Sequence, residues 1–64
     1  MMKSFTIYDR DLDPFIRAHL YAALSDGFIP YWVALKIDGH FVRFEKNVRE
    51  KSVTFYYEDE NDDI

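Results

Sequence analysis

The strongest constraint on the fold is a helix whose two ends are both marked in the sequence. Asp13 suits the N-cap, because its carboxylate can accept from the free amides of the first turn, and Pro14 suits the first helical position. Gly27 suits the left-handed position that ends a helix, and Pro30 prevents continuation. Apolar residues recur between these signals at three- and four-residue spacing. The sequence therefore predicts a helix from about 14 to 26.

Alternation of apolar and polar residues predicts strands on both sides of this helix. Residues 3–8 and 52–57 alternate in this way. Residues 31–37 and 40–46 flank Asp38-Gly39, a favoured pair for a two-residue type I′ turn, and so predict a hairpin. The predicted fold class is α+β, in the order β-α-β-β-β. One helix packs across one face of a four-stranded, mainly antiparallel sheet.

The predicted turn fixes which residues of the hairpin share a face. Val33 would lie opposite Phe44 on the apolar face toward the helix, and Trp32 would lie on the other face. Aromatic residues make up 19% of the chain, which is more than a small core can hide. We therefore predict an aromatic and basic binding face away from the helix, formed by Tyr8, Trp32, Lys36, Phe41, Arg43 and Tyr56.

Charge is distributed unevenly along the chain, whose net charge is −4. Residues 1–57 carry eight basic and seven acidic side chains, and we predict that they form a single domain. Residues 58–64 form an acidic tail, predicted to be disordered. A body without excess positive charge makes nucleic acid an unlikely partner. The acidic side chains of the tail are Glu58, Asp59, Glu60, Asp62 and Asp63.

No pattern in the chain predicts catalysis, a metal site or a cofactor. Asp9, Asp11 and Asp13 have the spacing that opens a calcium loop, but the glycine and the final acidic residue of such a loop are missing. His19 and His40 have no cysteine or serine partner at a catalytic spacing, and the chain contains no cysteine. We expect a non-enzymatic protein. Since neither a secretory signal nor a membrane-spanning stretch is present, we expect it in the cytoplasm.

The function predicted from these features is that of a small protein-binding regulator or inhibitor. The aromatic face would contact the partner, and the acidic tail would attract a basic surface. In size and composition alone the chain is similar to phage-encoded inhibitors of host proteins, which implies a basic or nucleic-acid-handling host protein as target. Two alternatives remain open at this point. The same face could stack the bases of a single strand, or two copies could form a homodimer that enlarges a thin core.

Overall fold

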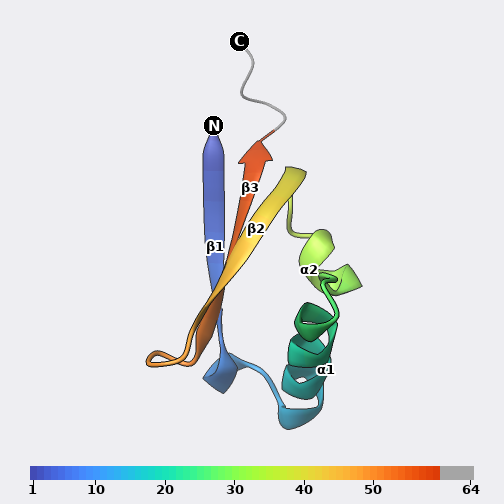
Figure 1. Cartoon of the computed structure of the whole chain (residues 1–64), viewed down its shortest axis with the longest axis vertical. Helices are drawn as coiled ribbons and strands as arrows, with labels where there is room; N and C mark the ends of the chain where they lie inside the picture. Colours follow the sequence, from blue (N-terminus) through green and yellow to red (C-terminus); the bar gives the residue numbers. More distant parts are fainter. Residues whose placement is uncertain (60–64) are drawn as a thin grey trace.

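The computed structural model describes residues 1–59 and shows a three-stranded antiparallel sheet with a helical layer on one side (Figure 1). The strands lie in the order β1-β3-β2, so β3 is central. The α+β class is thus confirmed. The elements are β1 (Met2–Tyr8), a 3-10 helix η1 (Asp9–Asp11), α1 (Pro14–Ser25), the four-residue helix α2 (Tyr31–Ala34), β2 (Gly39–Asn47) and β3 (Ser52–Asp59).

Helix α1 begins and ends where its capping signals predict. The Asp13 carboxylate accepts a 3.0 Å hydrogen bond from the amide of Ile16, and Pro14 is the first helical residue. Gly27 has a φ of 84°, and the amide of Phe28 donates to the carbonyl of Ala23 at 2.9 Å. This is the Schellman arrangement, in which a residue without a side chain turns the backbone out of the helix. The helix prediction is confirmed.

The predicted strand over residues 31–37 is wrong, and with it the four-stranded sheet. These residues form α2 and the turn that follows it. Val33 is fully buried whereas Leu35 is 68% exposed, so the two side chains do not share a face as a strand requires. Pro30 precedes the helix, and the spacing of Val33 and Ile37 suits a helical turn as well as alternation does. The observed element order is therefore β-α-α-β-β.

The predicted Asp38-Gly39 hairpin turn is also wrong. A type I′ turn needs a positive φ at both central residues, and here only Gly39 has one, at 143°. Strand β2 instead forms its hairpin with β3, through the polar connection 48–51. Asn47 Oδ1 accepts from the amide of Glu50 at 3.0 Å, and Lys51 has a φ of 55°. A side-chain hydrogen bond and one left-handed residue thus close this turn.

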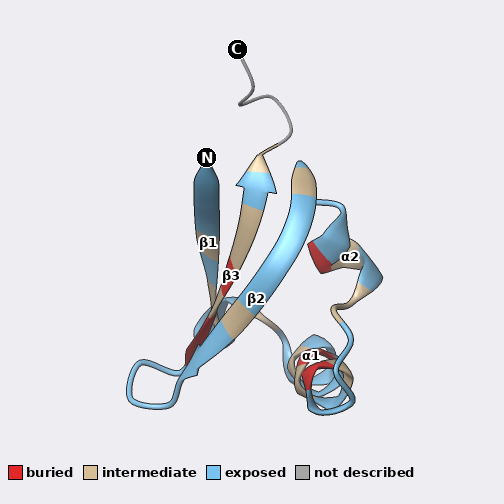
Figure 2. Ribbon diagram, turned by 45° about the horizontal axis from the view of Figure 1, so that its top comes forward, coloured by how far each residue is buried: buried red, intermediate tan, exposed pale blue. Residues whose placement is uncertain are grey.

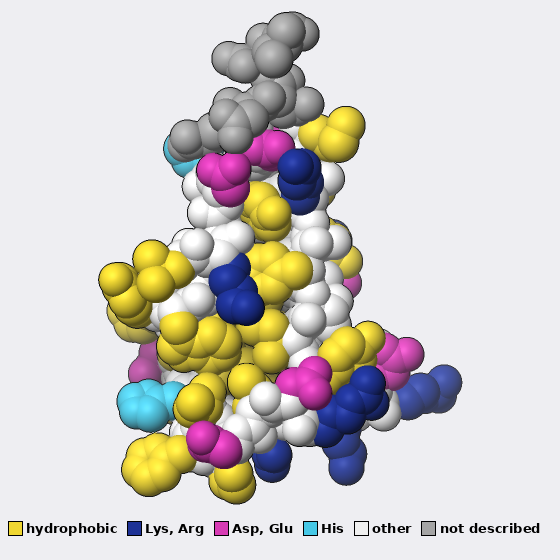
Figure 3. All heavy atoms as spheres, turned by 180° about the vertical axis from the view of Figure 1, so that it is seen from behind, with side chains coloured by type: hydrophobic (Ala, Val, Ile, Leu, Met, Phe, Trp, Pro, Cys, Tyr) yellow, Lys and Arg dark blue, Asp and Glu magenta, His cyan; other side chains and the backbone are white. Residues whose placement is uncertain are grey.

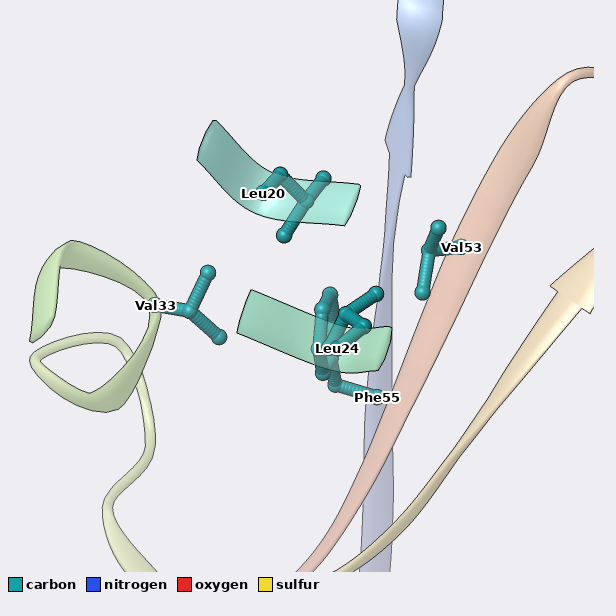
Figure 4. Close-up of a cluster of buried hydrophobic side chains, with 5 residues drawn as sticks. All are labelled: Leu20, Leu24, Val33, Val53 and Phe55. Atoms are coloured by element: carbon teal, nitrogen blue, oxygen red, sulfur yellow. The ribbon is translucent and has the colours of Figure 1, made fainter. Parts of the chain in front are cut away.

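The core lies between the sheet and the helical layer and is small. Its fully or nearly fully buried apolar side chains come from α1, α2 and β3 and point toward one another (Figure 4). Most of the sheet and helix surface outside this cluster is exposed or half-buried (Figure 2). So thin a core agrees with the expectation for a chain of this length. The core residues are Leu20, Leu24, Val33, Val53 and Phe55.

Candidate functional site: a groove beside the edge strand

The residues of the predicted binding face do not lie on one face of the sheet. Arg43 pairs with Tyr56 on the face opposite Val53 and Phe55, which we call the outer face. Phe41 lies before a β-bulge and pairs with Tyr57, whose ring packs 6.1 Å from that of Phe5 on the helix side. The bulge reverses the alternation on which the predicted face depended. Trp32 belongs to α2 and packs against the core, and Lys36 follows that helix. The predicted platform for stacking bases therefore does not form.

On the outer face, Arg43, Glu45 and Tyr56 form a closed polar cluster. Arg43 forms an ion pair with Glu45, and its guanidinium lies 4.3 Å from the centroid of the Tyr56 ring. The Tyr56 hydroxyl donates to Glu45 Oε1 at 3.3 Å. The hydrogen bond from Arg43 lowers the pKa of Glu45, and the same bond raises the pKa of Arg43. The charges of this cluster are satisfied within the chain.

A larger feature lies on the other side of the sheet, between β1, α1 and α2. It is a groove of about 870 Å³, which we call the β1 groove. Hydrophobic side chains gather across the middle of the molecular face on which it opens (Figure 3). Its polar rim includes Asp11, His19 and Lys36. The apolar and aromatic lining consists of Ile7, Tyr8, Leu12, Ile16, Ala23, Pro30, Tyr31 and Trp32.

Helix α1 forms one wall of the β1 groove because it carries two apolar stripes. Leu20 and Leu24 enter the core, whereas Ile16 and Ala23 line the groove. The second stripe is rotated from the first by about a fifth of a turn, at 3.6 residues per turn. In the sequence the apolar residues of this helix form one periodic set, so the pattern did not predict this wall. The apolar residues of this helix cover a wider arc than the core of so short a chain can bury. That width was the signal in the sequence that could have predicted the groove wall.

The other wall of the β1 groove is the edge strand β1, whose outer edge pairs with no described residue. The amide of Asp9 donates to the carbonyl of Lys51 at 2.9 Å, and the amide of Asp59 donates to the carbonyl of Met1 at 3.2 Å. These directly paired residues show that odd-numbered positions of β1 bond to β3, since bonding alternates along an antiparallel strand. The even-numbered positions therefore direct their amides and carbonyls outward. They are Met2, Ser4, Thr6 and Tyr8.

The β1 groove is lined by one acidic and one basic side chain. Asp11 lies in η1, directly after β1, and Lys36 lies in the turn that follows α2. Within residues 1–59 neither side chain forms an ion pair or a hydrogen bond. Among the same residues, no three histidine, cysteine or acidic side chains lie close enough to hold a metal ion. The groove thus offers apolar contact, an unpaired strand edge and two fixed charges.

A second hollow, of about 620 Å³, lies between η1, α1 and the turn of the β2–β3 hairpin. The Tyr21 hydroxyl donates to Asp9 Oδ1 at 2.6 Å, and Lys46 Nζ lies 5.9 Å from the centroid of the Tyr21 ring. Burial, and then the hydrogen bond to Asp9, raises the pKa of Tyr21 to about 12. The Arg10 guanidinium lies 4.7 Å from the centroid of the Tyr8 ring. The bond between Tyr21 and Asp9 joins α1 to η1 at this hollow, whose lining also carries four basic side chains, Arg10, Arg17, Lys46 and Lys51.

The first two residues of the predicted acidic tail lie in β3 and form ion pairs with the start of the chain. Glu58 Oε1 lies 3.4 Å from the amino terminus, and Asp59 Oδ2 lies 2.8 Å from Lys3 Nζ. The hydrogen bond to Asp59 raises the pKa of Lys3. Glu60, Asp62 and Asp63 lie outside the described residues. The acidic group thus begins beside the amino-terminal end of β1.

Comparison with protein-family models, with curated proteins and with solved structures finds no match to this chain. None of the described helices is long and apolar enough to cross a membrane.

Proposed function

We propose that this protein is a non-catalytic binding module that regulates or inhibits another protein by holding an extended segment of it in the β1 groove. The observation that carries the proposal is an apolar groove of about 870 Å³ directly beside an unpaired strand edge. Extended peptides bind other proteins by adding a strand to such an edge. The edge supplies main-chain hydrogen bonds, and the groove supplies contacts that select the side chains.

The arrangement of β1 and the groove defines the segment that fits best. Along an extended chain, successive side chains point to opposite sides, so every second side chain of a bound strand would face the helices. The groove lining around Ile16, Tyr31 and Trp32 is apolar, and an apolar side chain at these alternate positions would bury the most surface there. Tryptophan and tyrosine are also the residues that most often dominate the binding energy of interfaces.

Charged side chains in the groove would select the charges of the bound segment, and acidic residues beside β1 would attract the partner from a distance. Lys36 favours an acidic side chain of the bound segment where it passes the turn after α2, and Asp11 favours a basic side chain where it passes η1. Glu58 and Asp59 lie near the amino-terminal end of β1, and the sequence adds three more acidic residues after them. This group would attract a partner with a basic surface, and its effect would weaken as salt is added.

The test is a selection of displayed random peptides on the wild-type protein, followed by binding of the synthetic peptides in solution. Trp32 is the only tryptophan and lines the groove, so its emission should shift to shorter wavelength when a peptide covers it. Ile16→Glu places a charge in the groove and should abolish this response. Val48→Glu is the matched control, because Val48 is an exposed apolar residue of the hairpin turn, far from the groove in the chain.

Binding of selected peptides with alternating apolar residues to the wild type and to Val48→Glu, but not to Ile16→Glu, would support the proposal. If peptides bind all three proteins equally, the binding surface lies elsewhere. If no peptide is enriched on the wild type over Ile16→Glu, the proposed function is wrong.

A further inference from the structure

We infer that the second hollow, between η1, α1 and the turn of the β2–β3 hairpin, binds a phosphate group that carries two negative charges. We call this hollow the basic hollow. Among the described residues only Tyr8 lines both it and the β1 groove, so the inference concerns a separate site and goes beyond the proposed function. A volume of about 620 Å³ lies within the range of sites that hold one small ligand.

Positive charge is concentrated in the basic hollow. Four of the eight basic side chains of the sequence line it together with two acidic ones, which leaves an excess of two positive charges in a chain whose net charge is −4. Figure 3 shows basic side chains gathered at the end of the molecule that carries the β2–β3 turn. A phosphomonoester carries close to two negative charges at neutral pH and would balance this excess. The basic residues are Arg10, Arg17, Lys46 and Lys51, and the acidic residues are Asp9 and Glu50.

The positive charges of the basic hollow are not neutralised within the chain. None of its four basic side chains forms an ion pair with a described residue. Arg10 instead lies 4.7 Å from the centroid of the Tyr8 ring, and Lys46 lies 5.9 Å from that of Tyr21. A ring face attracts a cation without cancelling its charge. The rings therefore position two cations and leave their charges for a ligand.

Arg17 is the half-buried basic residue of the hollow, and its donors are not all used. Its Nη2 donates to the carbonyl of Leu12 at 3.2 Å, whereas its Nε is buried and has no acceptor among the described residues. Buried donors in folded proteins almost always have an acceptor, so this one needs an explanation. A guanidinium has five donors, and its fork geometry matches the oxygens of a phosphate. A bound phosphate would supply both the acceptors and the counter-charge that the described residues do not provide.

The arrangement of the basic residues favours a single phosphate over the backbone of a nucleic acid. Their side chains line one hollow and do not follow a row along the surface. A nucleic-acid strand is bound by cations along successive phosphates, each a diester with one negative charge. Lys3 and Arg43, which lie outside the hollow, are held in ion pairs with acidic residues. The ligand is therefore a phosphomonoester, from a free small molecule or from a phosphorylated protein side chain.

Isothermal titration calorimetry of the full chain with phenyl phosphate would test the inference, at about 0.1 M salt, where the Debye length is about 10 Å. Lys46→Gln should weaken binding about fivefold, because one cation of the hollow is lost. Lys3→Gln is the matched control, since it makes the same change at the other end of β1, and it should alter binding by less than about 1.5-fold. Glu50→Gln removes a carboxylate from the hollow and should tighten binding about threefold, which loss of folding cannot produce.

Two further probes define the ligand. Dimethyl phosphate, a diester with one negative charge, should bind at least about tenfold more weakly than phenyl phosphate. A short peptide with one phosphoserine distinguishes the two sources of a phosphomonoester. Tighter binding of this peptide than of phenyl phosphate would assign the source to a phosphorylated protein, and weaker binding would assign it to a small molecule.

A wild type that binds no phenyl phosphate would overturn the inference. Equal weakening by Lys46→Gln and Lys3→Gln would overturn it as well, because the effect would then come from net charge. A diester that binds as tightly as the monoester would point to nucleic acid instead. Ile16→Glu should bind phenyl phosphate like the wild type while it loses the peptide response of Trp32, so the basic hollow and the proposed function are tested separately.

Discussion

The hydroxyl of Tyr21 donates a 2.6 Å hydrogen bond to Oδ1 of Asp9 and so joins the middle of α1 to η1, the 3-10 helix that directly follows β1. Tyr21→Phe removes this bond and keeps the ring, which packs against the core. We expect the free energy of unfolding to fall by about 1 kcal/mol, because a hydrogen bond to a charged acceptor at a half-buried site is lost. Urea unfolding at neutral pH would measure the change. An unchanged midpoint would show that the bond contributes nothing to stability.

The same pair predicts a loss of stability at alkaline pH. The pKa of Tyr21 rises from 10.0 to about 12, first by burial and then by the bond to Asp9. A group whose pKa is raised by folding stabilises the protein fully below its unfolded pKa, and this contribution is lost as the pH rises through the folded value. The difference in stability between wild type and Tyr21→Phe should therefore shrink between pH 10 and pH 12. A difference that stays constant over this range would contradict the assignment.

Two substitutions distinguish the observed helix α2 from the strand that the sequence predicted over residues 31–37. Val33→Ala removes two methyl groups from a fully buried site and should cost about 2 kcal/mol of unfolding free energy. Leu35→Ala changes a side chain that is largely exposed and should alter stability by less than about 0.5 kcal/mol. In the predicted strand both side chains would face the core. Similar losses from the two substitutions, measured by chemical denaturation, would favour the strand.

The contrast between α1 and α2 shows which parts of the fold the sequence can predict. The ends of α1 are determined by local chemistry, in which Asp13 accepts from an amide and Gly27 adopts a positive φ, so adjacent residues were sufficient. For residues 31–37 the apolar positions fit both a strand and a helical turn. The choice depends on contacts of Val33 with α1 and β3, which are distant in the chain and give no local signal.

The candidate site was harder to predict than the fold, because it depends on the order of the strands. Placing β3 in the centre makes β1 an edge strand, and this order cannot be read from alternation. The bulge after Phe41 then moved that ring to the helix side. Trp32 and Lys36 were predicted to lie on the outer face of the sheet, whereas the structure places them along a groove formed with α1.

The lowered pKa of Glu45 predicts that a small part of the free energy of unfolding is lost in acid. Its pKa is lowered from 4.5 by the hydrogen bond from Arg43. A group whose pKa is lowered by folding stabilises the protein above its unfolded pKa, and the contribution is lost as the pH falls through the folded value. Glu45→Gln should therefore be less stable than the wild type at pH 7, and the difference should vanish below the pKa of Glu45. The substitution Glu50→Gln is the control, because it removes one negative charge from the hairpin turn and leaves the Arg43–Glu45 pair in place. An equal loss of stability in this variant would trace the effect to net charge. Thermal melting from pH 7 down to pH 2 would decide between these outcomes.

Lys51 holds the least favourable backbone conformation among the described residues other than glycine, with a φ of 55° in the turn between β2 and β3. A side chain at this φ crowds the following carbonyl, and glycine avoids the clash. Lys51→Gly should therefore raise the free energy of unfolding by about 1 kcal/mol, after allowance for the greater freedom of glycine in the unfolded chain. Lys51→Ala is the matched control, because it removes the same charged side chain and keeps the strain. Chemical denaturation should show stabilisation by glycine alone. If alanine stabilises equally, the effect comes from removing the charge beside Arg49, and the strain at this position is negligible.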